Sequence, residues 1–295
     1  MNEFIFYKKR GFSALIGDTF IFFKKYARNF FSNYLIVNGA ILAATGIIAS
    51  AMLALYASSS FSIGFGPTAL LVLVLLLSIL LILFVICYPI AYTQMLEEAP
   101  YRGDISAKEI FAKMKVMLPR AFVFGFISIF VIGIPYGFIL TGITALNERE
   151  PVLSQLISTF IGSFMILFVQ QFMLLYIKDK MDYFPALGKV IDQLKVGFWD
   201  KFGATFVMYL ITMAIMIAGI IVPMVVYLVV LGGLSGFEAT ISNVILVFIL
   251  VLIVITIAFV VSNFQTFLQI LIHFGEKDAD YIDEIDLIGQ NAQEE

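Results

Sequence analysis

The stretch Ala69–Tyr92 reads ALLVLVLLLSILLILFVICYPIAY and contains no Asp, Glu, Lys or Arg. A helix of about 20 apolar residues crosses a hydrocarbon core of ~30 Å, so this stretch predicts a transmembrane helix. The composition of the whole chain agrees, because 61% of its 295 residues are hydrophobic and 13% are charged. A soluble globular domain carries roughly a quarter charged residues. The sequence therefore excludes a soluble protein and indicates an integral membrane protein.

Six long uncharged apolar windows predict an all-α, polytopic membrane fold with six transmembrane helices. We expect the spans at about residues 34–56, 69–92, 121–146, 152–177, 202–231 and 240–274. Short, nearly uncharged outer connections join them into three hairpins. We expect residues 1–275 to form a single six-helix membrane domain, and residues 276–295 to form an acidic cytoplasmic tail.

The basic residues predict the orientation of these spans. Of the 18 Lys and Arg residues, 17 fall on one side of the expected bundle and only Arg149 falls on the other. The positive-inside rule places the side with more Lys and Arg in the cytoplasm. We therefore expect a multi-pass protein of the bacterial cytoplasmic (inner) membrane with both termini in the cytoplasm.

An amphipathic cytoplasmic helix is expected before each of the three hairpins, because the apolar residues there have helical spacing. A shift of 91 and then of 80 residues aligns Lys24 with Lys115 and Lys195, together with apolar neighbours. This alignment favours an internal repeat in which each unit is one amphipathic helix and one hairpin. Three independent membrane-surface helices would show the same spacing, so that alternative stays open.

Basic side chains recur beside the apolar faces of these helices. The candidate lipid- or partner-binding residues are Lys24, Lys25, Arg28, Lys115 and Lys195. A cation near an anionic leaflet gains on the order of 1 kcal/mol. This pattern favours a non-enzymatic scaffold or accessory protein that binds membrane lipids, with another membrane protein or a second copy as candidate partners. We expect no nucleic-acid partner.

Neutral polar residues cluster at the inner ends of the second, fourth and sixth spans, and they support an alternative function. A small-solute transporter or channel could use them to line a cavity that opens inward. The candidate cavity residues are Tyr88, Tyr92, Gln170, Gln171, Asn263, Gln265 and Gln269. Interhelical hydrogen bonds, worth about 0.6 kcal/mol per pair, would explain the same residues without a cavity.

The sequence supplies no set of residues typical of an enzyme, so we expect no catalytic residue, cofactor or metal. His273 is the only histidine and Cys87 is the only cysteine. A single histidine without clustered cysteines or carboxylates cannot build a usual metal site. We therefore expect His273 to lie at the surface or at the membrane interface.

The chain resembles a group of bacterial polytopic membrane proteins. The resemblance depends on the six-span layout and on two segments, FSALIGDTFIFFKKYARNFF (residues 12–31) and KMKVMLPRAFVFGF (residues 113–126). This group includes the membrane domain attached to some glycerophosphodiester phosphodiesterases and uncharacterised stand-alone relatives. The soluble catalytic domain of those phosphodiesterases has no counterpart here, because no segment outside the expected spans is long enough. The resemblance implies a membrane protein of unassigned role and carries over no catalytic residue.

Overall fold

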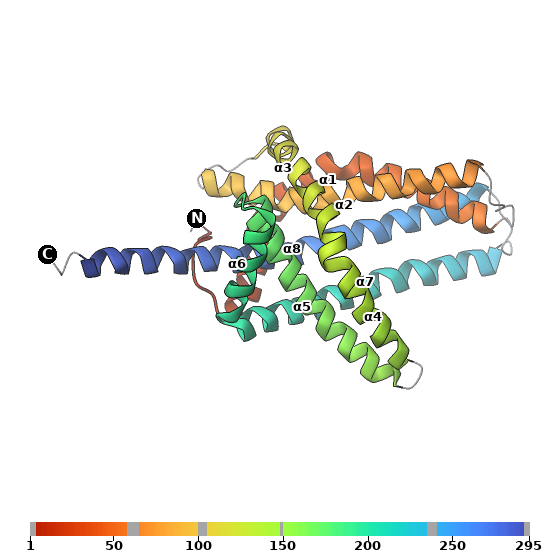
Figure 1. Ribbon diagram of the computed structural model, residues 1–295. Coiled ribbons are helices and arrows are strands. Elements are labelled where there is room, and N and C mark those ends of the chain that lie inside the picture. Colours follow the sequence, from red (N-terminus) through yellow and green to blue (C-terminus); the bar gives the residue numbers. More distant parts are fainter. Residues whose placement is uncertain (1–3, 58–64, 100–104, 148–149, 235–240, 292–295) are drawn as a thin grey trace.

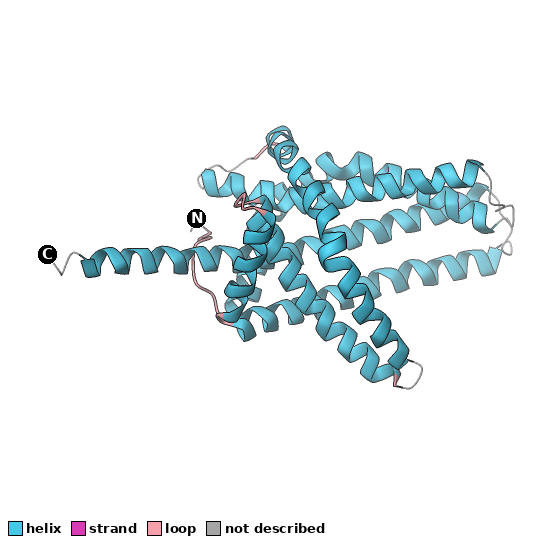
Figure 2. Ribbon diagram, in the orientation of Figure 1, coloured by secondary structure: helices cyan, strands magenta, loops and turns pink. Residues whose placement is uncertain are grey.

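The computed structural model describes residues 4–57, 65–99, 105–147, 150–234 and 241–291. Within these residues the chain is helical and contains no strand (Figure 2), which confirms the predicted all-α fold. The elements in chain order are α1 (Phe12–Ala57), α2 (Phe65–Glu98), α3 (Ala107–Ser128), η1 (Ile129–Gly133), α4 (Ile134–Asn147), α5 (Pro151–Ile177), α6 (Tyr183–Lys195), α7 (Phe198–Leu234) and α8 (Ile241–Asn291).

Six helical stretches are long and apolar enough to cross a membrane. The six expected spans lie, in order, within α1, α2, the continuous α3–η1–α4 stretch, α5, α7 and α8, except that residue 240 of the last span lies outside the described residues. The predicted polytopic fold of six membrane helices is therefore confirmed. The expected outer connection that contains Arg149 lies partly outside the described residues.

The three amphipathic segments differ in how they join their spans. In the first two units the segment and the span form one continuous stretch, as α1 and as α3–η1–α4. In the third unit α6 is a separate helix that ends at Lys195, and α7 begins at Phe198. Gly197 lies between them with a φ of +60°, a conformation that glycine adopts without steric cost, so the chain turns there.

Two of the positions aligned by the expected repeat have matching exposure in all three segments. Phe23, Met114 and Leu194 are all buried, whereas the three aligned lysines are all exposed. A third aligned position differs, because Phe20 and Ile191 are exposed whereas Phe111 is half-buried. The internal repeat itself stays a prediction.

Helix α8 lies in the middle of the molecule, where it packs against α7, α1, α5 and α2 (Figure 1). Its inner half meets α1 through aromatic side chains. The rings of Phe22 and Phe267 stack with their centroids 3.7 Å apart, and both side chains are fully buried. Aromatic pairs of this kind add about 0.5–1.5 kcal/mol beyond the area that they bury. The core of the fold therefore lies at the ends of the spans on the side of the two chain termini.

The α4–α5 hairpin leans away from α1, α2, α7 and α8 towards its outer tip (Figure 1). The bend follows the π-helical turn η1, which ends at Gly133, two residues before Pro135. Proline has no backbone N–H and its ring crowds the preceding turn, so a wider turn accommodates it. Most side chains of α4 and of the first turns of α5 are exposed to the surroundings of the bundle, whereas the last turns of α5 are buried.

The expected acidic tail begins inside α8. The helix continues without a break to Asn291, and in Figure 1 its final turns extend past all the other helices. The last four residues lie outside the described part of the chain. The tail is therefore a continuation of the central helix rather than a separate element.

Replacing Phe22 by alanine should destabilise the fold, because it leaves a cavity against Phe267 in the aromatic core. Comparable buried substitutions cost about 3–5 kcal/mol. We expect a clearly lower thermal unfolding midpoint for purified Phe22→Ala protein in detergent. Phe138→Ala is the control, because the Phe138 side chain is 74% exposed on α4 and should leave the midpoint unchanged. Equal shifts in both variants would contradict the assigned core.

Candidate functional site

The five basic residues singled out in the sequence are all exposed. Lys24, Lys25 and Arg28 lie on α1, Lys115 lies on α3 and Lys195 ends α6. Three of them interact locally. The Lys25 and Lys115 ammonium nitrogens lie 5.0 Å and 5.2 Å from the ring centroids of Tyr26 and Phe111, and Lys195 pairs with Asp192 at 2.6 Å. We call these five residues the basic set.

Large apolar side chains are exposed next to the basic set. Val116 directly follows Lys115 and is 73% exposed, and Trp199 lies four residues after Lys195 and is 74% exposed. Ile21, one turn before Lys25, is 56% exposed. Exposed cations next to exposed apolar and aromatic side chains are typical of helices that lie at a membrane–water interface.

The two tyrosines that we expected to line a cavity form hydrogen bonds to α1. The Tyr88 hydroxyl donates to the backbone oxygen of Phe30 at 2.6 Å, and the Tyr92 hydroxyl donates to Asn29 Oδ1 at 2.9 Å. Both tyrosines are buried. These bonds join α2 to α1, which is the role expected of interhelical hydrogen bonds.

The amide residues on α5 and α8 form a second polar layer. Gln171 Nε2 donates to Gln269 Oε1 at 3.0 Å and to its backbone oxygen at 2.8 Å. Gln269 Nε2 donates in turn to Thr205 Oγ1 of α7 at 2.8 Å. This chain of hydrogen bonds links three spans in the buried interior.

Several polar atoms of the same residues lack a hydrogen-bond partner within the described chain. They are Gln170 Oε1, Gln171 Oε1, Asn263 Oδ1 and both amide atoms of Gln265. Asn263 uses its amide nitrogen on Phe259 of its own helix. A buried polar atom without a partner costs free energy, so these atoms are candidates to bind water or a small polar molecule.

A pocket of about 260 Å³ lies where the inner ends of α2, α5 and α8 meet. Its lining residues are Gln94, Glu97, Glu98, Lys178, Asp179 and Lys277. We call it the charged pocket. None of the predicted cavity residues lines this pocket. Except for Gln94, its lining residues are the charged ones just beyond the predicted amides and tyrosines.

Two ion pairs cross the charged pocket. Lys178 Nζ lies 3.1 Å from Glu97 Oε2, and Lys277 Nζ lies 2.6 Å from Asp179 Oδ1. His273 Nε2 lies 3.2 Å from Asp179 Oδ2. These contacts tie the end of α5 to α2 on one side and to α8 on the other.

The environment shifts the pKa values of the two residues that follow α5. Burial lowers the pKa of the Lys178 ammonium, and the carboxylate of Glu97 opposes this shift. Burial alone would raise the pKa of Asp179. The hydrogen bonds and charges of His273 and Lys277 outweigh it and lower the pKa of Asp179 from 3.8 to about 2. The Asp179 carboxylate is therefore charged at neutral pH.

Residues 4–11 form a strap that crosses the inner end of α8 before α1 begins. The Tyr7 hydroxyl bonds to the carboxylate of Glu97, so the strap reaches the charged pocket. Arg10 holds the strap in shape, because it donates to the backbone oxygen of Phe6 at 2.7 Å and pairs with Asp18 of α1 at 2.7 Å. A Cβ at Gly275 would lie 3.3 Å from the Lys8 oxygen, so the strap packs closely on α8.

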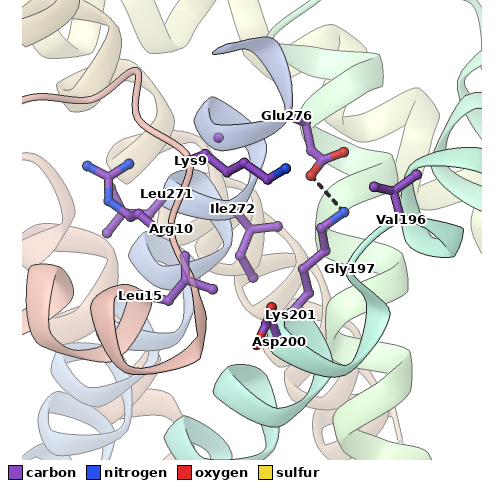
Figure 3. Close-up of a pocket in the computed structure, with 11 residues that line it drawn as sticks. Lys9, Arg10, Leu15, Val196, Gly197, Asp200, Lys201, Leu271, Ile272 and Glu276 are labelled. Carbon is purple, nitrogen blue, oxygen red and sulfur yellow. Dashed lines mark ion pairs between the residues drawn. The ribbon is translucent and has the colours of Figure 1, made fainter. Parts of the chain in front are cut away.

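A second pocket, of about 220 Å³, lies between the strap, the start of α7 and α8 (Figure 3). Lys201 crosses it and pairs with Glu276 at 2.7 Å. The same ammonium donates to the backbone oxygen of Gln193 at 2.6 Å. Arg10 also lines this pocket, but the strap and Asp18 already use its donors. The main cations of this pocket are thus satisfied within the chain.

The expected surface position of His273 is wrong, because its side chain is fully buried. Its partner Asp179 is 94 residues away in the sequence, and no local pattern joins them. The sequence reasoning also missed Glu97, Lys178 and Lys277. A usable signal was present, since charges of both signs directly follow the apolar runs of the second, fourth and sixth spans.

Because the pKa of Asp179 is lowered in the folded protein, its contribution to stability should be complete above the ordinary value of 3.8 and should disappear as the pH falls towards 2. We expect Asp179→Asn to lower the thermal unfolding midpoint at pH 7. The difference from the unsubstituted protein should shrink at pH 3. Thermal melts of both proteins in detergent at pH 7, 5 and 3 measure this. A constant difference across that range would contradict the assigned network.

Comparisons with known protein families, with curated proteins and with solved structures find no match to this chain. The resemblance to the membrane domains of glycerophosphodiester phosphodiesterases therefore stays a prediction, and the chain is described by its own geometry as an integral membrane protein with six candidate spans.

Proposed function

We propose that this integral membrane protein is a non-enzymatic scaffold or accessory protein of the bacterial inner membrane that binds anionic lipids through the basic set. The observation that carries the proposal is the exposure of all five cations next to exposed apolar side chains. Each cation near an anionic leaflet contributes on the order of 1 kcal/mol. The apolar neighbours, Trp199 among them, add burial in the interface.

The orientation belongs to the same proposal. The basic set lies on the side with 17 of the 18 Lys and Arg residues, so this side faces the cytoplasm and its anionic lipids. Both termini are then cytoplasmic. Another membrane protein or a second copy of the chain is a candidate partner for the same surface.

A small-solute transporter or channel is the second candidate, and one observation favours it. The unpaired amide atoms of Gln170, Gln171, Asn263 and Gln265 are buried within membrane-spanning helices. Such atoms can bind a small polar solute or water on its way through the bundle. The Gln171–Gln269–Thr205 hydrogen bonds oppose this use, because they hold the same layer closed.

Removing the charges of the basic set should weaken lipid binding. In the variant Lys24→Gln, Lys25→Gln, Arg28→Gln, Lys115→Gln and Lys195→Gln, we expect preferential binding of phosphatidylglycerol over phosphatidylcholine to fall, by roughly fivefold for each cation lost. Lipid co-purification and the quenching of Trp199 fluorescence by brominated lipids measure this. Trp199 is the only tryptophan, so its signal is specific.

The matched control keeps every charge and changes the same lysines to arginine, with Arg28 unchanged. This control should bind phosphatidylglycerol as the unsubstituted protein does. Unchanged lipid preference, unchanged membrane localisation and unchanged partner binding in the glutamine variant would rule out the proposal.

Cysteine labelling tests the orientation. In a Cys87→Ala background, Arg149→Cys should react with a membrane-impermeant maleimide added to intact cells, because its loop is expected outside. Lys115→Cys should react only after the membrane is permeabilised. The reverse pattern would overturn both the orientation and the proposed lipid contact.

A further inference from the structure

Lys178 has unused hydrogen-bond donors that face the charged pocket. Its side chain is only 4% exposed, and its ammonium lies 3.1 Å from Glu97 Oε2 and 3.5 Å from the centroid of the Phe274 ring. An ammonium carries three N–H donors, yet Nζ meets hydrogen-bond geometry with no group in the described chain. A buried charge with one partner and unfilled donors is costly. The pocket beside it has room for an acceptor.

The charges of the pocket come from the ends of three helices. Glu97 and Glu98 come from α2, Lys178 and Asp179 directly follow α5, and Lys277 belongs to α8. Asp179 already has two partners, His273 and Lys277. The carboxylates of α2 and the two lysines therefore form two oppositely charged pairs. A ligand that carries only one sign of charge is repelled by one of these two pairs. A zwitterionic ligand complements both pairs, because its anionic group can accept hydrogen bonds from the lysines while its ammonium donates hydrogen bonds to the glutamates.

Three of the residues that line the pocket have partly exposed side chains. Glu98 and Lys277 are 67% and 36% exposed at their side chains, and Glu97 is 25% exposed. Exposed ion pairs contribute roughly 0–1 kcal/mol, so exchanging the Glu98–Lys113 pair for a ligand ammonium costs little. Lys178 lines the pocket itself, so its ammonium lies next to the space that the ligand would occupy.

The depth of the pocket points to the bilayer as the source of the ligand. Lys178 is the first residue after α5, Glu98 is the last residue of α2, and Lys277 ends the apolar stretch of α8. The ends of apolar spans lie where lipid headgroups lie. A headgroup can therefore reach these side chains while its acyl chains stay in the membrane.

From these observations we infer that the charged pocket binds the phosphoethanolamine headgroup of phosphatidylethanolamine. The phosphate accepts hydrogen bonds from Lys178 and Lys277, and the ammonium donates to Glu97 and Glu98. This site is separate from the basic set in residues and in lipid class, so either proposal can fail without the other.

Native mass spectrometry of the full-length protein with defined lipids tests the inference. Because phosphatidylcholine has the same net charge but no ammonium N–H, we expect phosphatidylethanolamine to bind about tenfold more tightly, the value of one charge-assisted hydrogen bond. Lys178→Gln and Lys277→Gln should each weaken both lipids by about tenfold. Equal binding of the two lipids by the unsubstituted protein would overturn the inference.

A matched pair of variants separates the pocket from the surface ion pair beside it. Glu98→Gln and Lys113→Gln both remove the Lys113–Glu98 pair, but only Glu98 lines the pocket. We expect Glu98→Gln to lose the preference for phosphatidylethanolamine and Lys113→Gln to keep it. Equal losses in the two variants would overturn the assignment of Glu98 to the ligand ammonium. The side chains of Glu98 and Lys113 are partly exposed. We therefore expect both variants to fold, so this test stands even where Lys178→Gln fails to fold.

Soluble glycerophosphoethanolamine distinguishes a lipid from a free ligand. A headgroup site for a lipid should bind the soluble compound at least tenfold more weakly than the lipid, because the acyl chains no longer contribute. Binding of the soluble compound as tightly as the lipid would overturn the lipid source.

Discussion

Exclusion of charge from the bilayer separates the ionic contacts of this protein from its neutral polar contacts. A charged side chain at the centre of a membrane helix costs about 2.5–3.5 kcal/mol on insertion scales, and none of the six expected spans contains one. The spans are joined to one another by tyrosines, amides and stacked aromatic rings. The Lys178–Glu97 and Lys277–Asp179 ion pairs form where apolar spans end, at the meeting point of α2, α5 and α8.

The six spans could be predicted because the signal is local: a long uncharged apolar run must be a helix in lipid, where every backbone group needs a partner within the segment. The exposure of Lys24, Lys115 and Lys195 was also predictable, because helical spacing determines which residues share a face. The Asp179–His273 and Tyr7–Glu97 contacts were not, since each joins residues about 90 or more positions apart. Only packing brings such residues together.

The break between the amphipathic helix and its span is another feature that the spacing of residues does not predict. The sequence predicts three equivalent units, yet only the third has two separate helices, because Gly197 allows the chain to turn. In α1 no such residue interrupts the helix, and the amphipathic segment and the span become one element of 46 residues. Spacing indicates the face of a helix, whereas single residues such as Gly197 and Pro135 decide where the helix bends or ends.

The charged pocket and the basic set are connected through two ion pairs of unequal strength. Lys113 joins α3, which carries Lys115, to Glu98 at the pocket, but Glu98 is 67% exposed and such a pair contributes little. Lys201 joins α7 to Glu276, next to Lys277, with side chains only 10% and 19% exposed. Breaking a pair this buried leaves an uncompensated charge, which is costly. The same Lys201 ammonium donates to the backbone oxygen of Gln193 in α6, so α6, which carries Lys195, is tied to the central helix through a buried ion pair, whereas the Lys113–Glu98 pair of α3 is the more exposed of the two.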